Sequence, residues 1–356
     1  VGKVLEEIRL DLLKGGYNPP PVRYTEIPKG KDSTRPLGIP TVKDRIVQTA
    51  MKLVVEPIFE ADFKGSSFGF RPKRNQHQAL EVIRKACNNR GNYVLDADIK
   101  GYFNNINHDK LMLLVEKRIN DRRVLKLIKK WLEAGVMIAG KKMATTVGSP
   151  QGSAISPLLS NIYLDYLDTV WERHYSHLGK LVRFADDFVI ICKNKKDVEH
   201  SYAVIREVMR RLDLELSVEK TKVVNLWGGK EGFIFLGYHH RKTKQKTVSG
   251  REYYAVERWI CKKKYKQIKE VIRAITSKST TYKEPKAMIS ILNPKISGWR
   301  NYYKLSPTRM LRKLDSFIRH RLVIWYNMKH RKRKTYKYYT VSQLLYRLGL
   351  KRMVVY

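Results

Sequence analysis

The sequence predicts an α+β protein in which a mixed body of helices and strands is followed by a basic, helical C-terminal domain. Segments with helical periodicity alternate with short strand-like runs before residue 241, whereas after residue 260 the periodicity is helical alone. The charge changes in the same region, because residues 241–356 hold 32 Lys and Arg residues against 5 acidic ones. The 43% of hydrophobic residues is enough to build sizeable cores, which excludes a disordered chain.

Apolar residues at three- and four-residue steps predict the helices, and short β-rich runs predict the strands. Helices are expected over residues 42–60, 76–90, 109–134, 155–174, 197–212, 262–276, 285–303 and 308–328. Strands are expected over residues 93–99, 136–146, 181–192, 214–218 and 233–238.

The formal net charge of +39 points to a polyanionic partner. Nucleic acid is favoured over an anionic membrane surface as that partner. In addition, no apolar run approaches the roughly 18 residues of a membrane span. The 3 cysteines are too few and too far apart for a disulfide framework or a Cys-x-x-Cys zinc site. We therefore expect a nucleic-acid-binding protein with no membrane partner.

Two groups of acids stand where strands are expected to end. Asp186 and Asp187 interrupt the apolar run 181–192, which predicts a hairpin with both carboxylates at its tip. An Asp-Asp turn chosen only for its turn propensity is the alternative. Asp96 and Asp98 lie two apart at the end of the run 93–99, so both can point to one face. Two Mg²⁺ ions held by carboxylates catalyse phosphoryl transfer, so the spacing predicts a metal-dependent nucleic-acid enzyme.

Ordered motifs along most of the chain resemble the reverse transcriptases encoded by bacterial and organellar group II introns. Two of them carry the acids, residues 98–103 (Asp-Ile-Lys-Gly-Tyr-Phe) and residues 184–187 (Phe-Ala-Asp-Asp), where Phe184 stands in place of the usual Tyr. The others lie at residues 35–40 with 43–45, 68–72, 148–153 with 156–161, 219–222, 235–238, 292–294 and 298–303.

The resemblance implies a right-hand polymerase followed by an all-helical thumb or maturase domain. Fingers are expected over 1–92, with an incomplete N-terminal segment, a palm over 93–240 and the thumb/maturase domain over 241–356. It also implies an RNA-directed DNA polymerase that binds intron RNA as a splicing maturase. The implied partners are the RNA template, a DNA or RNA primer and dNTPs. The implied location is the bacterial cytoplasm, within a ribonucleoprotein, or an organelle.

For the metal site, the resemblance implies that two Mg²⁺ ions are held by Asp98, Asp186 and Asp187, with the Ile99 carbonyl as a further ligand. Asp96 matches no required carboxylate and is expected to be solvated or to support the site from behind.

For the nucleotide, the resemblance implies that Lys29 and Arg35 grip the triphosphate, that Gln151 and Gly152 form the pocket loop, and that Phe103 is a steric gate against a 2′-hydroxyl. Lys220 is expected to help protonate pyrophosphate. Each has an alternative: ordinary surface cations for Lys29, Arg35 and Lys220, a core aromatic for Phe103, and a plain turn for the loop.

Two other functions stay open. One is a maturase that only stabilises folded RNA, and intact acids at 98, 186 and 187 argue against it. The other is a domesticated reverse transcriptase in phage defence or CRISPR spacer acquisition, which would keep the polymerase site and change the partner.

Overall fold

The computed structural model describes residues 2–28, 34–138, 141–143, 148 and 152–354. The chain forms two compact units, Val1–Trp227 and Gly228–Tyr356. The predicted limit between residues 240 and 241 falls inside a strand, Tyr238–Lys246. The division into fingers, palm and thumb stays a prediction.

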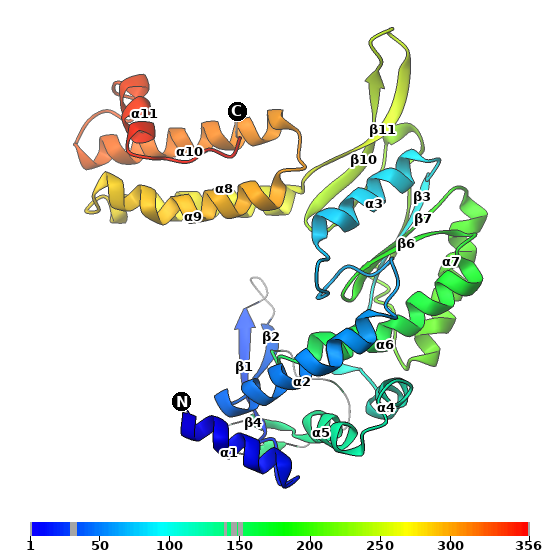
Figure 1. Ribbon diagram of the computed structural model, residues 1–356. Helices are drawn as coiled ribbons and strands as arrows, with labels where there is room; N and C mark the ends of the chain where they lie inside the picture. Colours follow the sequence, from blue (N-terminus) through cyan, green and yellow to red (C-terminus); the bar gives the residue numbers. More distant parts are fainter. Residues whose placement is uncertain (1, 29–33, 139–140, 144–147, 149–151, 355–356) are drawn as a thin grey trace. The chain divides into compact units, whose positions relative to one another are not determined.

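The first unit combines helices with two sheets (Figure 1). Its helices are α1 (Gly2–Leu13), α2 (Val42–Glu60), α3 (Gln76–Asn88), α4 (His108–Glu116), α5 (Arg122–Glu133), α6 (Ser156–Val170) and α7 (Lys195–Arg211), with a short 3-10 helix η1 (Tyr102–Asn104) and a π-helix η2 (Trp171–Tyr175) that continues α6. Its strands are β1 (Val22–Pro28), β2 (Thr34–Ile39), β3 (Tyr93–Asp98), β4 (Val136–Ile138), β5 (Lys141–Met143), β6 (Gly179–Phe184), β7 (Asp187–Cys192) and β8 (Lys222–Asn225).

The central sheet has the order β6-β7-β3-β8, and every neighbouring pair is antiparallel. Alternate residues point to opposite faces, so Leu95, Phe188 and Ile190 enter one core with apolar residues of α6 and α7. In Figure 1, α3 lies on the other side of these strands from α7. The second sheet, β2-β1-β4-β5, joins the predicted fingers segment to residues 136–143.

Local capping explains where several helices begin. Thr41 caps α2 by accepting a hydrogen bond from the Asp44 amide (3.2 Å), and Asn75 forms a capping box with Gln78 at α3. The helix predicted over 109–134 is wrong as one element. Asp121 accepts from the Arg123 amide (2.8 Å) and begins a second helix, because a cap satisfies the free amides of a helix start.

The central sheet also differs from prediction at one edge. Residues 214–218 form no strand, since only a single bridge joins Leu216 to Ile99. The edge position belongs to β8, whose short Lys-Val-Val-Asn sequence gave no clear strand signal. The hairpin predicted over 181–192 is confirmed as β6 and β7.

The second unit is a three-stranded sheet followed by helices. Its strands are β9 (Gly232–Phe235), β10 (Tyr238–Lys246) and β11 (Glu252–Ile260), and its helices are α8 (Lys262–Ile275), α9 (Pro285–Tyr303), α10 (Thr308–Lys329) and α11 (Tyr338–Arg347), with a short 3-10 helix η4 (Lys278–Thr280). The short element η3 (Trp227–Gly229) spans the limit between the two units. The helical periodicity after residue 260 is confirmed, and α10 packs on α8 and α11 (Figure 1). The long β10–β11 hairpin was not predicted, because its charged residues hide the strand alternation.

Within the described part of the chain, no helix has both the length and the apolar character that crossing a membrane requires.

Candidate active site

The predicted acidic turn is the tip of the β6–β7 hairpin. Phe184 pairs with Asp187, which leaves Ala185 and Asp186 as the two turn residues. Ala185 has φ 58°, a left-handed conformation that costs a non-glycine residue about 1–2 kcal/mol. A turn of this kind holds two successive carboxylates at the end of the sheet, and strain of this kind gathers at functional sites.

Asp98 comes to the same end of the sheet from β3. It is the register partner of Asp187, so the two carboxylates stand on adjacent antiparallel strands. The Lys220 ammonium donates to Asp98 Oδ1 at 2.9 Å. The turn that carries Lys220 is tied to β3, because the Ser217 amide donates to the Asp98 carbonyl (2.8 Å). The structure therefore brings Asp98, Asp187 and Lys220 together.

The Asp187 carboxyl has a raised pKa in this cluster. Loss of hydration at the crowded sheet end and then the charges of Asp186, Asp98 and Asp96 raise the pKa of Asp187 to about 6, although the residue is solvent-accessible. The ammonium of Lys220 opposes this shift only in part. A cation placed among these carboxylates would favour their charged forms.

Asp96 shares the Asp98 face of β3 and lies opposite Lys222 of β8. Its Oδ2 is 3.7 Å from Lys222 Nζ. Burial raises the pKa of Asp96 to about 6, in spite of that lysine. Asp96 is thus engaged by a neighbouring cation, in line with the expectation of a supporting acid.

A buried ion pair supports the turn at Ala185 and Asp186. The side chains of Arg183 and Asp168 are both fully buried, and Arg183 Nε donates to both Asp168 oxygens at 3.1 Å. Arg183 Nη1 also donates to the Ala185 carbonyl (2.9 Å) and to Asn161 Oδ1 (3.1 Å). Asn161 in turn donates to the Gly69 carbonyl (2.9 Å). The strained conformation at Ala185 is held by this network.

Residue 69 must be glycine because the backbone of Ala185 lies directly against it. A Cβ atom at residue 69 would lie 2.3 Å from the Ala185 amide nitrogen. The Phe68 amide donates to the Arg183 carbonyl (2.9 Å), so the segment with the 68–72 motif runs along the β6 edge up to the turn. The sequence pattern assigns no individual role to Arg183 or Asp168, and it includes Asn161 only as part of the motif 156–161. The signal was a charged residue inside an apolar strand, directly before the acidic turn.

Phe103 lies in the η1 turn that follows β3. Its ring is partly buried, packs on the main core and meets Tyr102 edge-on with centroids 5.3 Å apart. Gly148 reaches this turn with φ 95°, and a Cβ there would lie 2.9 Å from the Asn104 carbonyl oxygen. The first glycine of the predicted nucleotide loop therefore packs directly beside Phe103.

The other end of that loop contacts the predicted fingers segment. Gly152 has φ 109°, and a Cβ there would lie 2.8 Å from the Gly38 carbonyl oxygen of β2. The next residue, Ser153, donates to Gln48 Oε1 (2.7 Å), and Gln48 donates to the buried Asp44 (2.8 Å). At both Gly148 and Gly152, a positive φ and a close backbone neighbour explain why the residue is glycine. Gln151 lies outside the described residues.

Asp44 is the centre of a second buried network. Its Oδ1 accepts from Tyr17 (2.8 Å) and from the Trp131 indole (2.7 Å). Burial raises the pKa of Asp44, and these hydrogen bonds oppose the shift. Asp44 belongs to the Lys-Asp-Arg motif of residues 43–45, and its place in the structure links α2 with α5 and with the nucleotide loop.

Of the two predicted triphosphate-binding residues, Lys29 and Arg35, only the second lies in the part of the chain that the structure describes. The backbone of Arg35 pairs with Ile27 in the β1–β2 hairpin. Arg35 lies on β2, the strand whose Gly38 carbonyl is close to Gly152. The roles of Lys29 and Arg35 stay predictions.

The acidic cluster fits Mg²⁺ as an incomplete site. Within the described part of the chain no group of three His, Cys, Asp or Glu side chains has the spacing of a complete metal site. Mg²⁺ usually takes one or two protein carboxylates and completes its shell with water and substrate phosphates. Asp98 and Asp187 stand as register partners and would supply such a pair, and Asp186 is next to Asp187 in the turn. Ile99 is buried and bridges to Leu216, and its ligand role stays a prediction.

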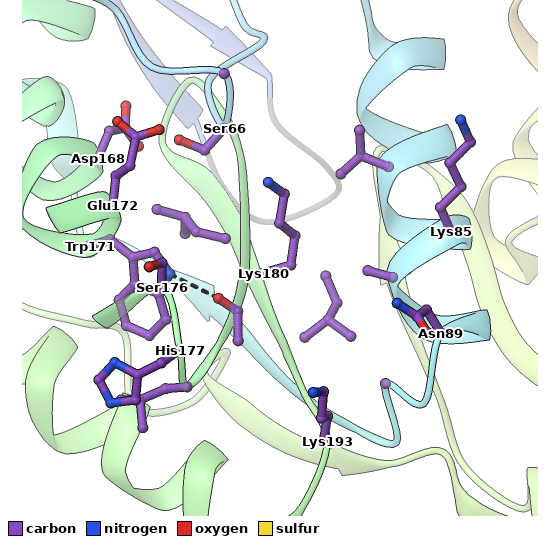
Figure 2. Close-up of a pocket in the computed structure, with 18 residues that line it drawn as sticks. Ser66, Lys85, Asn89, Asp168, Trp171, Glu172, Ser176, His177, Lys180 and Lys193 are labelled. Carbon is purple, nitrogen blue, oxygen red and sulfur yellow. Dashed lines mark hydrogen bonds between the residues drawn. The ribbon is translucent and has the colours of Figure 1, made fainter. Parts of the chain in front are cut away.

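A separate cavity of about 720 Å³ lies near the opposite end of β6 (Figure 2). Lys180, Lys85 and Asn89 line it together with the Trp171 indole, which donates to the Gly179 carbonyl (3.1 Å). Its three lysines, Lys85, Lys180 and Lys193, are exposed surface residues. This cavity is not part of the acidic cluster.

A four-stranded antiparallel sheet with carboxylates at a hairpin tip, helices on its faces and a basic helical unit after it define a nucleic-acid polymerase of the right-hand class. Comparison with known proteins gives the family. Residues 27–240 match the reverse transcriptase (RNA-dependent DNA polymerase) family, and residues 265–341 match the group II intron, maturase-specific domain. The chain belongs to the reverse transcriptase family and carries a maturase-specific domain.

Two curated proteins are similar in sequence to this chain. Protein YkfC of Escherichia coli (strain K12) is 37% identical over 282 residues, which cover 69% of this chain and 73% of YkfC. Group II intron-encoded protein LtrA of Lactococcus lactis subsp. cremoris is 34% identical over 245 residues, which cover 68% of this chain and 38% of LtrA. The match therefore spans less than half of LtrA.

A solved structure agrees in fold. Apo telomerase from Candida tropicalis, truncated from its C-terminal domain, superposes with a TM-score of 0.50 at 15% identity, over 65% of this chain and 54% of that chain. The right-hand fold expected from the sequence is confirmed.

Proposed function

We propose that this chain copies RNA into DNA, with Asp98, Asp186 and Asp187 holding two Mg²⁺ ions. The observation that carries the proposal is the register pairing of Asp98 with Asp187 at the end of the central sheet, where loss of hydration and then clustered negative charge raise the pKa of Asp187 to about 6. In a protein of net charge +39, such a cluster is a place for cations. Bound Mg²⁺ would activate the primer hydroxyl and stabilise the leaving pyrophosphate.

The chain's own residues arrange the substrate around these acids. Phe103, beside Gly148, would lie under the sugar of the incoming nucleotide and exclude a 2′-hydroxyl. Gly152 lies against the Gly38 carbonyl of β2, the strand that carries Arg35. Gln151 would contact the incoming nucleotide, and Arg35 and Lys29 its triphosphate. Lys220, within reach of Asp98, would supply a proton to the departing pyrophosphate.

The proposed RNA partner is the structured RNA of a group II intron, bound by the basic second unit. Residues 241–356 carry an excess of 27 positive charges, as a surface that follows phosphates needs. The maturase-specific domain at residues 265–341 supports splicing assistance as a second role. We place this activity in a ribonucleoprotein of a bacterial cytoplasm, in keeping with the bacterial relatives.

Primer extension tests the polymerase role. A DNA primer on an RNA template is incubated with dNTPs and Mg²⁺, using the unaltered chain and Asp186→Asn. Because a metal ion supplies several kcal/mol of charge stabilisation, the variant is expected to lose about 1,000-fold or more in rate. Asp109→Asn, on the exposed start of α4, makes the same charge change as a control. Equal rates for the two variants would refute the assignment.

Splicing separates the two roles. The Asp186→Asn chain is expected to retain binding of intron RNA and stimulation of splicing, because the metals act only in DNA synthesis. An unaltered chain that promotes splicing yet never extends a primer would identify a maturase without polymerase activity.

A further inference from the structure

A second cavity, of about 400 Å³, lies within the second unit on one face of the β10–β11 hairpin. Arg241 pairs with Glu257, and His239 pairs with Trp259, so Arg241, Glu257 and Trp259 share that face. Tyr265 of α8 and the start of α10 complete the walls. We call this cavity the Trp259 pocket.

The Trp259 pocket is positively charged. Arg241 lines it from the sheet, and Arg309 and Lys313 line it from α10. Its acid, Glu257, accepts a hydrogen bond from Arg309 Nη2 at 2.8 Å and is neutralised by it. The remaining charge of Arg241 and Lys313 favours an anionic ligand over a neutral or cationic one.

Arg241 has an unused buried donor. Its guanidinium carbon lies 5.5 Å from the centroid of the Trp259 ring. Its Nε is shielded from solvent, and no atom of the described residues accepts a hydrogen bond from it. A guanidinium is always charged and has donors only, so Arg241 adds a fixed positive charge beside the Trp259 ring.

Flat aromatic surfaces complete the chemistry. Trp259 and Tyr265 both line the pocket and are both partly exposed. An aromatic ring beside a guanidinium plane is a surface on which a nucleobase stacks. A base within a duplex has both faces covered by its neighbours, so a pocket of this kind selects an unpaired nucleotide.

We propose that the Trp259 pocket binds one unpaired nucleotide of RNA. The base stacks against Trp259 beside the charged Arg241 side chain, and the adjoining phosphate contacts Lys313 and Arg309. This proposal rests on the proposed function in taking RNA as the partner, and it adds a site at which single-stranded RNA is distinguished from duplex.

Binding of two RNA probes to the full chain tests the proposal. A short labelled single strand without self-complementarity is compared with a blunt RNA duplex of equal length. Arg241→Met is expected to weaken single-strand binding about 10-fold, within the range for loss of one stacked base, and to leave duplex binding nearly unchanged. Arg251→Met removes the same charge from an exposed residue just before β11 and is the matched control. Equal losses in the two variants, or equal losses for both probes, would overturn the proposal.

Photocrosslinking gives a result that does not depend on a variant folding. The unaltered chain is irradiated with a single-stranded RNA that contains 4-thiouridine, and the crosslinked peptides are identified by mass spectrometry. Crosslinks at Trp259 or Tyr265 are expected, and crosslinks confined to other segments would contradict the proposal.

The two proposals can fail separately. Crosslinking at Trp259 in a chain that never extends a primer would refute the polymerase role and retain the pocket. Normal primer extension without crosslinks at Trp259 or Tyr265 would refute the pocket and retain the polymerase role.

Discussion

The two units of this protein differ in how far an ion pair is buried. The first unit contains the Arg183–Asp168 pair, whose side chains have no exposed surface. In the second unit, ion pairs such as Lys329–Glu284 keep an exposed partner, because the Glu284 side chain is 76% exposed. The difference indicates that charge fixes local geometry around the acidic turn in the first unit and attracts a polyanion in the second.

Removing one partner of the buried Arg183–Asp168 pair tests this difference between the units most directly. Asp168→Asn leaves the Arg183 guanidinium buried without its counter-charge, and breaking a pair of this kind costs about 3–5 kcal/mol. We expect a loss of that size in the free energy of unfolding, measured by urea titration. Hydrogen exchange should accelerate first in β6 and β7. Primer extension should fall as well, because the Ala185 turn loses its anchor.

Glu207→Gln is the control for this variant. Glu207 pairs with Arg210 and Arg211 on the exposed side of α7, so its loss should change stability very little. Similar losses for Asp168→Asn and Glu207→Gln would show that burial of the pair contributes nothing special.

The second unit is expected to be the more acid-sensitive because of one buried imidazole. His240 is fully buried and stacks on Phe233, with ring centroids 4.9 Å apart. Burial and then the nearby charges of Arg258 and His239 lower the pKa of His240 to about 3. The unfolded chain takes up this proton near pH 6.5, so stability present above that pH is lost as the pH falls toward 3.

At pH 5 this loss amounts to about 2 kcal/mol. The difference in unfolding free energy between the unaltered chain and His240→Phe, measured from pH 7 to pH 5, isolates the contribution from that of the carboxylates. A difference that stays constant over this range would contradict the assignment of a neutral buried histidine.

Choice of nucleotide should depend on the first unit alone. Phe103→Ala is expected to relax discrimination against ribonucleotides by about 10-fold, the effect of reshaping a pocket that recognises one group. Competition between dCTP and CTP in primer extension measures this ratio. Leu114→Ala removes packing from the same core at a distance from the turn and should leave the ratio unchanged. Equal ratios in all three proteins would return Phe103 to a purely structural role.

The smallest expected effect on stability concerns Lys220. Its side chain is 57% exposed, so Lys220→Met should change the free energy of unfolding by less than about 0.5 kcal/mol. The Mg²⁺ concentration for half-maximal primer extension should nevertheless fall, because no ammonium competes for Asp98. Lys100→Met, which disrupts an exposed pair with Glu215, should leave that concentration unchanged. A higher Mg²⁺ requirement in Lys220→Met would contradict this prediction.

Much of this arrangement can be read from the sequence where the pattern is local. The Asp186–Asp187 hairpin and the helix over residues 285–303 follow from apolar spacing. What cannot be read is which distant residue satisfies a buried charge. Arg183 donates to Asp168 and Asn161 because α6 packs against the sheet. No periodicity in the sequence indicates which residues of α6 these partners are. The β10–β11 strands were missed for a related reason, since polar residues on both faces conceal the alternation that marks a strand.

The buried Arg183 network also limits how this sequence can change over evolutionary time. All three guanidinium nitrogens are engaged, by Asp168, Asn161 and the Ala185 carbonyl. A lysine offers a single nitrogen and cannot reproduce this fan of bonds. Gly69 is restricted in addition by the Ala185 backbone beside it. Substitutions at residues 69, 161, 168 and 183 should therefore be inherited together, so that related sequences co-vary at these four positions while the exposed ion pairs drift independently.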